Sequence, residues 1–208
     1  MARKTPEEAA RTRQRILDAA VEVFVRDGIA SATLEEVAQQ AGVSRGAIYW
    51  HFKGKQDLLQ RILDEQAHPL ECTVPADIGF QAGWQRLRED LGESVSEDAP
   101  RRLTEIILHK SERRAASEPI PLRLERLREC FMRRLQRLLT DAVANGELAA
   151  ELDIPAISEV FQGCIGGLLF ECLQRPGAAA RKIAATLDTL LYLLQNPPAH
   201  LLQANRGQ

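Results

Sequence analysis

The segment TLEEVAQQAGVSRGAIYWHF, residues 33–52, decides the fold of this chain. Thr33 and Glu36 have the spacing of a capping box, which marks the start of a helix. Apolar residues then recur at three- and four-residue steps as far as Gly42, a residue that readily adopts the positive φ of a tight turn. Ser44 can cap a second short helix. Two short helices joined by a glycine turn form a helix-turn-helix motif.

The second short helix carries many groups that can reach outward. Ile48 and Phe52 have the spacing of core residues, and one of the other aromatic residues could also be buried. The small residues Gly46 and Ala47 would let the helix approach the floor of a DNA groove, although glycine costs helix stability. The crowding of side chains able to contact bases and phosphates favours DNA binding. These residues are Ser44, Arg45, Gly46, Tyr49, Trp50 and His51.

Helical patterns flank the motif on both sides. Before it, Thr5-Pro6-Glu7-Glu8 offers a capping box with proline at the first helical position, and Gly28 is placed to end that helix. After it, Lys53-Gly54 interrupts the chain, and a fourth helix is predicted at about 55–67. We therefore predict a three-helix DNA-binding domain over residues 1–55.

Charge gives weaker support for this interpretation. The chain of 208 residues has a formal net charge of -2, which does not indicate a nucleic-acid binder. Basic residues cluster at the start of the chain and again at Lys53 and Lys55, opposed near the N-terminus by Glu7 and Glu8. A locally basic face is compatible with phosphate contact, although charge runs usually only solvate a helix. The first cluster comprises Arg3, Lys4, Arg11, Arg13 and Arg15.

The remainder of the chain, residues 56–208, is predicted to form a larger helical domain. Helical periodicity occurs at about 79–95, 100–114, 120–145, 155–174 and 178–195, without strand-like alternation or internal repeats. Asn196-Pro197-Pro198 should end the last long helix, and we expect the tail beyond it to fray. The predicted fold class is all-α.

Composition excludes several classes of protein. No run approaches the eighteen or so apolar residues of a membrane span, and the N-terminus lacks the apolar stretch of a secretory signal, so a cytoplasmic protein is expected. The four cysteines show no metal-ligand spacing and are expected to be reduced and mostly buried thiols. We find no phosphate loop, nucleophile elbow or zinc-protease motif, so neither an enzyme nor a cofactor or metal site is predicted.

Residues 13–59 resemble the DNA-binding domain of the TetR family, in its AcrR/TtgR-like branch. The run TLEEVAQQAGVSRGAIYWHFKGKQDLL, residues 33–59, matches the family pattern almost position by position. The resemblance implies three DNA-binding helices, a linking fourth helix, and a larger helical domain that dimerises and encloses a ligand. It strongly covers about a quarter of the chain, and the remainder agrees with the family in length and helix layout.

The resemblance also implies roles for individual residues. Thr33 corresponds to a residue that binds phosphate through its hydroxyl and the helix N-terminus. Arg45 is the best candidate for direct readout, because its guanidinium can pair with guanine O6 and N7. The base-reading positions are Arg45, Gly46 and Ala47; the positions contacting phosphate, sugar or thymine methyl are Tyr49, Trp50 and His51; and Lys55 contacts phosphate.

Two apolar helices near the C-terminus are candidates for a dimer interface. Their repeats at three- and four-residue steps would build a four-helix seam between two chains, and Gly163, Gly166 and Gly167 would allow close approach of a partner helix. The alternative is that both helices are internal core. The predicted interface residues are Phe161, Ile165, Leu168, Leu187 and Leu191.

A ligand site is harder to locate from the residues. Aromatic stripes at helical spacing are usually core, and His109 with Glu112 could serve a polar ligand or form a solvated pair. The predicted pocket residues are Phe80, Trp84, Leu87, His109, Phe131 and Phe161. The arginine-rich run at 123–137 is interpreted as an exposed, salt-bridged face, since glutamates are interleaved with it.

These observations predict a regulator of transcription that responds to a ligand. A two-fold dimer would read a palindromic operator, and a small apolar or amphipathic effector would release it. The branch suggests a repressor of a multidrug efflux pump gene, by analogy. The alternatives are a DNA-binding activator, an architectural protein without ligand control, or a small helical enzyme.

Overall fold

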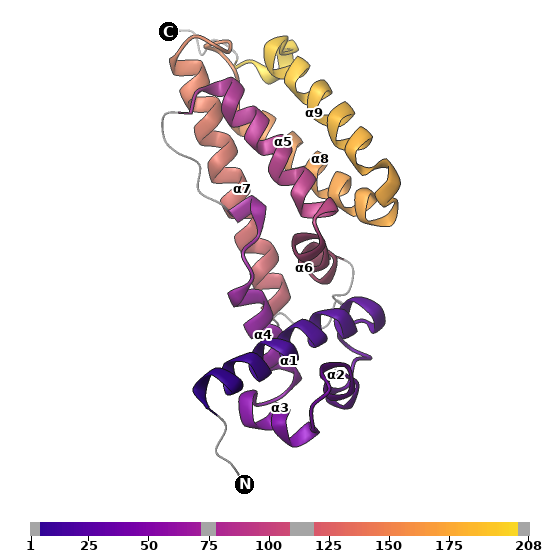
Figure 1. Ribbon diagram of the computed structural model, residues 1–208. Helices are drawn as coiled ribbons and strands as arrows, with labels where there is room; N and C mark the ends of the chain where they lie inside the picture. Colours follow the sequence, from indigo (N-terminus) through magenta and orange to yellow (C-terminus); the bar gives the residue numbers. More distant parts are fainter. Residues whose placement is uncertain (1–4, 72–77, 109–118, 204–208) are drawn as a thin grey trace. The chain divides into compact units, whose positions relative to one another are not determined.

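The computed structural model describes residues 5–71, 78–108 and 119–203, and these residues form an all-α fold, as predicted (Figure 1). Within the described part, extended pairing is limited to one isolated antiparallel bridge between Leu152 and Leu202. The α-helices are α1 (Pro6–Asp27), α2 (Leu34–Ala41), α3 (Arg45–His51), α4 (Lys55–Glu65), α5 (Phe80–Ser96), α6 (Asp98–Leu108), α7 (Pro119–Ala144), α8 (Ile154–Gln174) and α9 (Ala179–Gln195).

The chain divides into two compact units. Unit 1 comprises residues 1–67 and 102–124, and unit 2 comprises residues 68–101 and 125–208. This division does not follow the predicted boundary after residue 55, because α4 packs on α1 within unit 1, and α6 and α7 each contribute residues to both units.

The ends of the unit 1 helices follow from local chemistry. At the start of α1, the Thr5 hydroxyl accepts from the Glu8 amide at 3.2 Å, and the Glu8 carboxylate accepts from the Thr5 amide at 2.9 Å. Gly28 ends this helix with a φ of 81°, and Gly42 ends α2 in the left-handed region with a φ of 63°. The predicted capping boxes and glycine turns are thus confirmed.

An apolar core holds α1 to α3 together. Its fully buried side chains come from all three helices, and burying each large apolar side chain contributes about 1.5–3 kcal/mol. The core residues with 0% exposure include Ile16, Ala20, Val23, Phe24, Val37 and Ile48.

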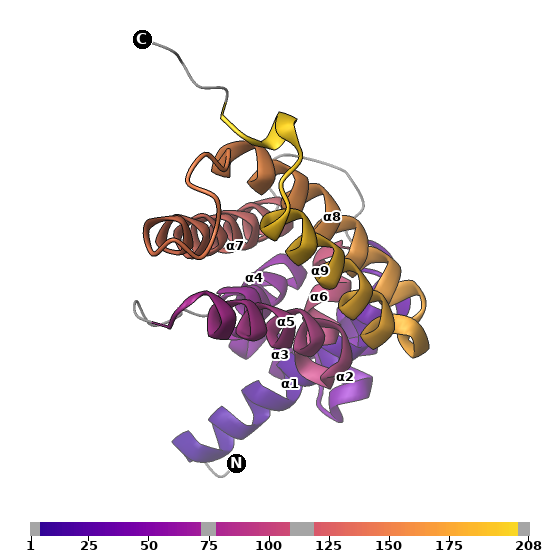
Figure 2. The ribbon, with the colours of Figure 1, turned by 90° about the horizontal axis from the view of Figure 1, so that it is seen from above.

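Unit 2 is a helical layer built on α5, α8 and α9, which lie side by side (Figure 2). Helix α7 approaches α5 closely at Gly83, where an added Cβ would lie 2.5 Å from Leu138 Cδ1, so a larger residue there would require the Leu138 side chain to move. Asp90 on α5 is fully buried and forms ion pairs with Arg86, at 2.8 Å, and with Arg134 on α7.

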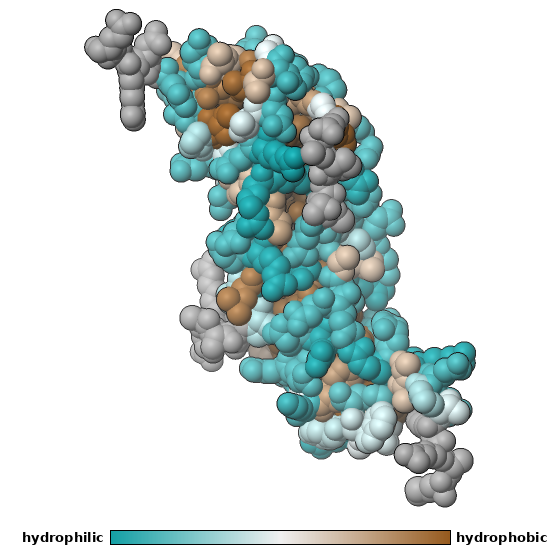
Figure 3. All heavy atoms as spheres, turned by 90° about the vertical axis from the view of Figure 1, so that its left-hand side faces the viewer, coloured by the Kyte–Doolittle hydropathy of each residue, from teal (hydrophilic) through white to brown (hydrophobic). Residues whose placement is uncertain are grey.

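The arginine-rich face of α7 was predicted correctly only in part. Arg128, Arg133 and Arg137 are exposed and pair with acidic residues on the same helix, and the face shown in Figure 3 is largely hydrophilic. Arg123, by contrast, is 6% exposed and donates to the carbonyl oxygen of Gln66 at 3.0 Å. Arg134 is also largely buried, because it neutralises Asp90. A fully buried carboxylate needs a compensating charge, and the sequence pattern could not indicate which arginine supplies it.

The C-terminal segment is packed through Gln203, which corrects the prediction that the chain frays after the last long helix. Asp153 donates its amide to the Leu201 carbonyl at 2.8 Å, and Gln203 donates to Glu151 at 2.7 Å. Leu201 is buried, and this apolar anchor holds the segment against the start of α8.

The cysteines of the described residues occupy three environments. Cys172 is buried, and burial raises the pKa of its thiol. Cys130 is half-buried and Cys164 is exposed, so the expectation of buried thiols holds only for Cys172 among the described cysteines. Cys72 lies outside the described residues.

Helix α8 is long and apolar enough to cross a membrane by length and composition alone. In the structure it packs in unit 2, with Ile157, Phe161 and Ile165 in the core. On the side of α8 that carries these residues, the apolar sequence is explained by packing in the core. No cluster of potential metal ligands occurs among the described residues.

Candidate functional site

Helix α3 presents most of its side chains to solvent. Ser44 caps the helix, its hydroxyl accepting from the Ala47 amide at 3.2 Å, while Ile48 and Phe52 are anchored in the core at 0% and 3% exposure. The two aromatic residues between them lie outside: Tyr49 is 50% exposed and Trp50 is 73% exposed. Neither belongs to the core, so the alternative that one of these aromatic residues is buried is excluded for both.

Arg45 and Tyr49 form a preorganised pair at the start of α3. The Arg45 Nη2 atom donates to the Tyr49 hydroxyl at 3.3 Å, and the guanidinium lies 5.6 Å from the ring centroid. This hydrogen bond raises the pKa of Arg45, whose guanidinium is in any case charged at neutral pH. A charged, planar fork on an exposed helix can pair with a guanine edge.

Gly46 is not required by the fold. A Cβ built there would meet one neighbouring atom, the Ser44 Oγ, at an unstrained 3.9 Å. Because glycine weakens a helix by about 1 kcal/mol relative to alanine, the chain carries a cost that its own packing does not explain. Close approach of an external surface would explain it.

Trp50 and His51 extend this surface toward the end of α3. Their rings meet edge to face with centroids 4.5 Å apart, and His51 is half-buried. Flat aromatic edges beside a charged fork suit contact with sugars and thymine methyl groups.

Thr33 and Lys55, the predicted phosphate contacts, both have partners within the protein. The Thr33 hydroxyl accepts from the Glu36 amide at 3.2 Å and donates to the Glu36 carboxylate at 2.7 Å. These contacts with Thr33 lower the pKa of Glu36. The Lys55 ammonium donates to the carbonyls of Ala30 and Ala32, at 2.9 and 2.8 Å, so it ties the start of α4 to the loop before α2. Of its three donors, one remains for a phosphate.

Two arginines that the sequence analysis named only as members of a basic cluster hold the helix-turn-helix in place. Arg15 on α1 donates to the carbonyls of Ala41 and Gly42, and so fixes the turn between α2 and α3. Arg13 on α1 lies 5.5 Å above the Phe52 ring and binds Glu65 on α4; hydrogen bonding by Arg13 lowers the pKa of Glu65. No motif spacing links residues so far apart in the chain, so no sequence signal indicates these contacts.

The predicted ligand residues form an aromatic interior in unit 2. The rings of Phe80 and Trp84 are 5.9 Å apart, and Trp84 meets Phe161 edge to face at 5.7 Å. Leu87 and Phe131 are likewise buried. His109, together with Glu112, lies outside the described residues.

Most of the predicted dimer residues lie inside the protomer. Phe161, Ile165, Leu168 and Leu187 are at most 7% exposed, and Leu191 is half-buried. The same two helices expose other apolar or small residues, namely Val160, Gly163, Cys164, Gly167 and Phe170 on α8 and Tyr192 on α9. Charged residues that include Glu159 and Glu171 are exposed beside them on α8.

Comparison with known proteins places this geometry in a family. Residues 16–62 match the group described as "Bacterial regulatory proteins, tetR family". The HTH-type transcriptional regulator SrpR of Pseudomonas putida is 39% identical over 97% of this chain and 94% of its own length. The chain belongs to the tetR family of bacterial regulatory proteins.

Two further relatives narrow the position within the tetR family. The HTH-type transcriptional regulator TtgR, also of Pseudomonas putida, is 32% identical over 96% of this chain and 99% of its own length. SmeT, solved as a complex with triclosan, is 25% identical with a TM-score of 0.70, covering 95% of this chain and 98% of SmeT. SmeT is described as the repressor of the Stenotrophomonas maltophilia multidrug efflux pump SmeDEF.

These findings confirm the predicted family and branch. As a tetR-family member the chain is a soluble, cytoplasmic transcription regulator that binds DNA through its helix-turn-helix, and it is not an enzyme. The exposed face of α3 is therefore the surface on which its DNA contacts should be sought.

Proposed function

We propose that this chain is a homodimeric repressor of a multidrug efflux pump gene. It binds a palindromic operator through α3 and is released when a small apolar or amphipathic molecule binds in unit 2. The observation that carries the proposal is the outward face of α3, which holds a charged fork, two exposed aromatic rings and a glycine without a packing role. The efflux repressor SmeT among its relatives supports the choice of target gene.

Reading DNA requires two copies of α3. A helix of seven residues contacts only a few base pairs, so one copy lacks specificity. Two copies about 34–36 Å apart would read half-sites in successive major grooves. Arg45 is assigned the base contact, whereas Thr33, Tyr49 and Lys55 position the helix on the backbone.

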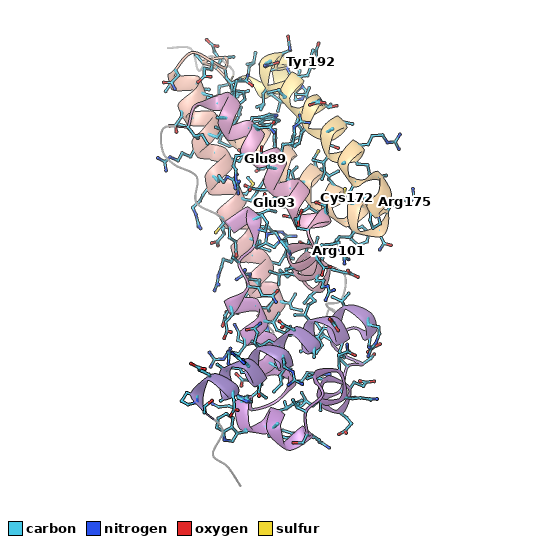
Figure 4. The ribbon with its side chains drawn as sticks, viewed as in Figure 1. Glu89, Glu93, Arg101, Cys172, Arg175 and Tyr192 are labelled. Carbon is cyan, nitrogen blue, oxygen red and sulfur yellow. The ribbon has the colours of Figure 1, made fainter. Side chains whose placement is uncertain are left out.

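The exposed side of α8 and α9 is proposed to be covered by a second copy of the chain. Val160 is 39% exposed, Phe170 46% and Tyr192 63%, which is unusual for large apolar residues on neighbouring helices. Tyr192 is labelled on α9 in Figure 4. At Gly163 and Gly167 an added Cβ would meet nothing within 4 Å, so neither glycine is needed for packing inside the protomer. An apolar face interrupted by glycines suits close contact with the same face of a partner.

Effector control requires a differential affinity between two states. An effector that prefers the DNA-incompetent state by a hundredfold supplies about 2.7 kcal/mol. Reciprocity then demands that operator DNA weaken effector binding by the same factor. The aromatic interior around Trp84 suits an aromatic molecule, and SmeT, a relative, is solved with triclosan.

The decisive experiment pairs two titrations. DNA next to the chain's own gene is searched for a protected palindrome, and triclosan is then titrated into free protein and into the protein–operator complex. The proposal expects weaker triclosan binding to the complex and release of the operator. Equal affinities would overturn ligand control, and a reporter gene that is activated by the protein would favour the activator alternative.

The dimer is tested separately with the double variant Val160→Glu/Phe170→Glu. Charges placed on this face should give monomers in sedimentation that keep their helical content but lose operator binding, because a charge cannot be buried in an apolar seam. The matched control is Gln81→Glu/Gln136→Glu, which adds the same two charges at exposed positions on α5 and α7, outside the proposed seam. A monomeric wild type at micromolar concentration would exclude the dimer.

A further inference from the structure

Trp84 holds a polar atom that the protein does not satisfy. The residue is 3% exposed, its ring lies between those of Phe80 and Phe161, and its indole Nε1 has no hydrogen-bond partner. Leaving a buried donor unpaired costs about 1–3 kcal/mol. An apolar ring would carry no such cost, so the unpaired indole nitrogen requires an explanation.

Ser158 is a second unsatisfied group, on the facing helix. It is fully buried, and its Oγ has no partner. Other helical hydroxyls bond the carbonyl four residues earlier: Ser94 donates to Asp90 at 2.6 Å and Thr140 to Gln136 at 2.8 Å. Ser158 makes no such bond, so its hydroxyl stays available although the usual solution is open to it.

The two groups belong to one region of unit 2. Ser158 lies one helical turn before Phe161 on α8, and the Phe161 ring contacts Trp84 on α5. Two donors without partners thus border one aromatic contact between α5 and α8.

The charge in this interior is already balanced. Among the described residues of unit 2, the buried carboxylate Asp90 pairs with Arg86 and Arg134, and Arg86 also lies 3.9 Å from the Glu89 carboxylate, so two guanidiniums face two carboxylates. The ring of buried His68 accepts from the Leu70 amide. A charged ligand would bring an uncompensated charge into an apolar site, which is far more costly than burying a neutral polar group. The region therefore favours an uncharged ligand.

We propose that the effector is an uncharged aromatic molecule with a hydrogen-bond-accepting oxygen, which the Trp84 indole N–H and the Ser158 hydroxyl bind between α5 and α8. The inference rests on the proposed function in that it names the chemical class of the effector. Indole nitrogen only donates and a serine hydroxyl can donate, so the ligand must supply an acceptor: a carbonyl, phenolic or ether oxygen. The aromatic body of the ligand would stack against Phe80 and Phe161.

The test uses two probes of matched shape, 2-acetylnaphthalene and 2-isopropylnaphthalene, which differ in the oxygen. Calorimetric titration of the full chain should show the ketone binding about three- to tenfold more tightly than the hydrocarbon. Trp84→Phe and Ser158→Ala should each reduce this preference. The readout is the ratio of the two affinities, because changing the Trp84 ring alters the contact with both probes. The double variant shows whether both donors bind the same oxygen: if they do, its loss is smaller than the sum of the single losses.

Thermal melts of the unliganded variants separate this role from a structural one. Because the Ser158 hydroxyl has no partner in the protein, Ser158→Ala should leave the melting temperature unchanged or raise it. Trp84→Phe removes an unpaired donor but also leaves a void beside Phe161, so its melt serves only to show that the variant is folded. The matched control is Ser94→Ala, which removes a buried hydroxyl that does have a partner. It should lower the melting temperature without changing the preference for the ketone.

Three results would overturn the inference: neither probe binds the wild type, both bind equally, or the Trp84 and Ser158 variants keep the full preference for the ketone. A loss of stability in Ser158→Ala would also count against it, because the hydroxyl would then have a partner in the protein. Operator binding is measured in parallel. If the ketone binds through these residues but does not release DNA, the proposed release mechanism fails while the ligand assignment stands.

Discussion

The two tryptophans of the chain lie in opposite environments, and each is typical of its region. Trp50 on α3 is 73% exposed and sits beside the exposed Tyr49, whereas Trp84 on α5 is 3% exposed and contacts two phenylalanine rings. In α3 the rings of Tyr49 and Trp50 are exposed, as expected if they contact another molecule. In unit 2 the rings of Phe80, Trp84 and Phe161 are enclosed. Identical residue types therefore serve an exposed contact surface in one region and an enclosed interior in the other.

The largest expected effect separates the two tryptophans directly. Trp84→Ala should lower the free energy of unfolding by about 3–5 kcal/mol, because it empties a buried site. Trp50→Ala should change it by less than about 0.5 kcal/mol, since the ring is solvated. Chemical denaturation of both variants, followed by circular dichroism, measures the contrast. Similar losses in the two variants would show that Trp50 is part of the fold.

Arg45→Ala comes next in expected size. It should weaken specific operator binding by about 1–3 kcal/mol and relax the preference at one base pair per half-site, because a bidentate contact to guanine is lost. A binding-site selection with wild type and variant measures both changes. The stability of the fold should be unaffected, since the side chain bonds only Tyr49 among the described residues. An unaltered base preference would reassign Arg45 to phosphate.

Lys55→Ala tests a residue that has contacts inside the protein and is also predicted to contact DNA. Its ammonium bonds two carbonyls, so the variant should lose about 1 kcal/mol of stability. It should also lower the slope of log K against log salt by about one, if the remaining donor binds phosphate. Melts and salt titrations are therefore needed together. Lost stability with an unchanged salt slope would leave Lys55 with the structural role alone.

Gly46→Ala should change stability least, and it should change stability and operator binding in opposite directions. It should raise the free energy of unfolding by up to about 1 kcal/mol, because alanine favours the helix and meets no close atom. Operator binding should fall at the same time, since the new methyl group faces the DNA. Opposite signs in the two measurements would show that the glycine serves recognition. A variant that binds as well as the wild type would contradict a close approach.

Local sequence rules predicted the helix ends well. The capping pairs Thr5–Glu8 and Thr33–Glu36, and the turn at Gly42, depend on residues only a few positions apart, and the structure forms each of them. Such interactions are encoded over a single turn of chain, so spacing alone identifies them.

Tertiary contacts could not be predicted in the same way. Periodicity showed that α8 has an apolar side, but it could not say which side is internal. The predicted interface residues Phe161 and Leu168 fill the core, while Val160 and Phe170 face outward. Arg134 belongs to a run of charges and yet is drawn inward by Asp90, a residue 44 positions earlier in the chain. These outcomes depend on which elements meet, and no short-range pattern specifies that.

The separation of the two tryptophans has a spectroscopic consequence. The chain contains no others, so its intrinsic emission is the sum of one indole in water and one in an apolar interior. The solvated ring emits at longer wavelength than the enclosed one. The long-wavelength edge of the spectrum therefore follows the DNA-reading helix, and the short-wavelength edge follows the interior of unit 2. Unlabelled protein carries two optical reporters, one for each region.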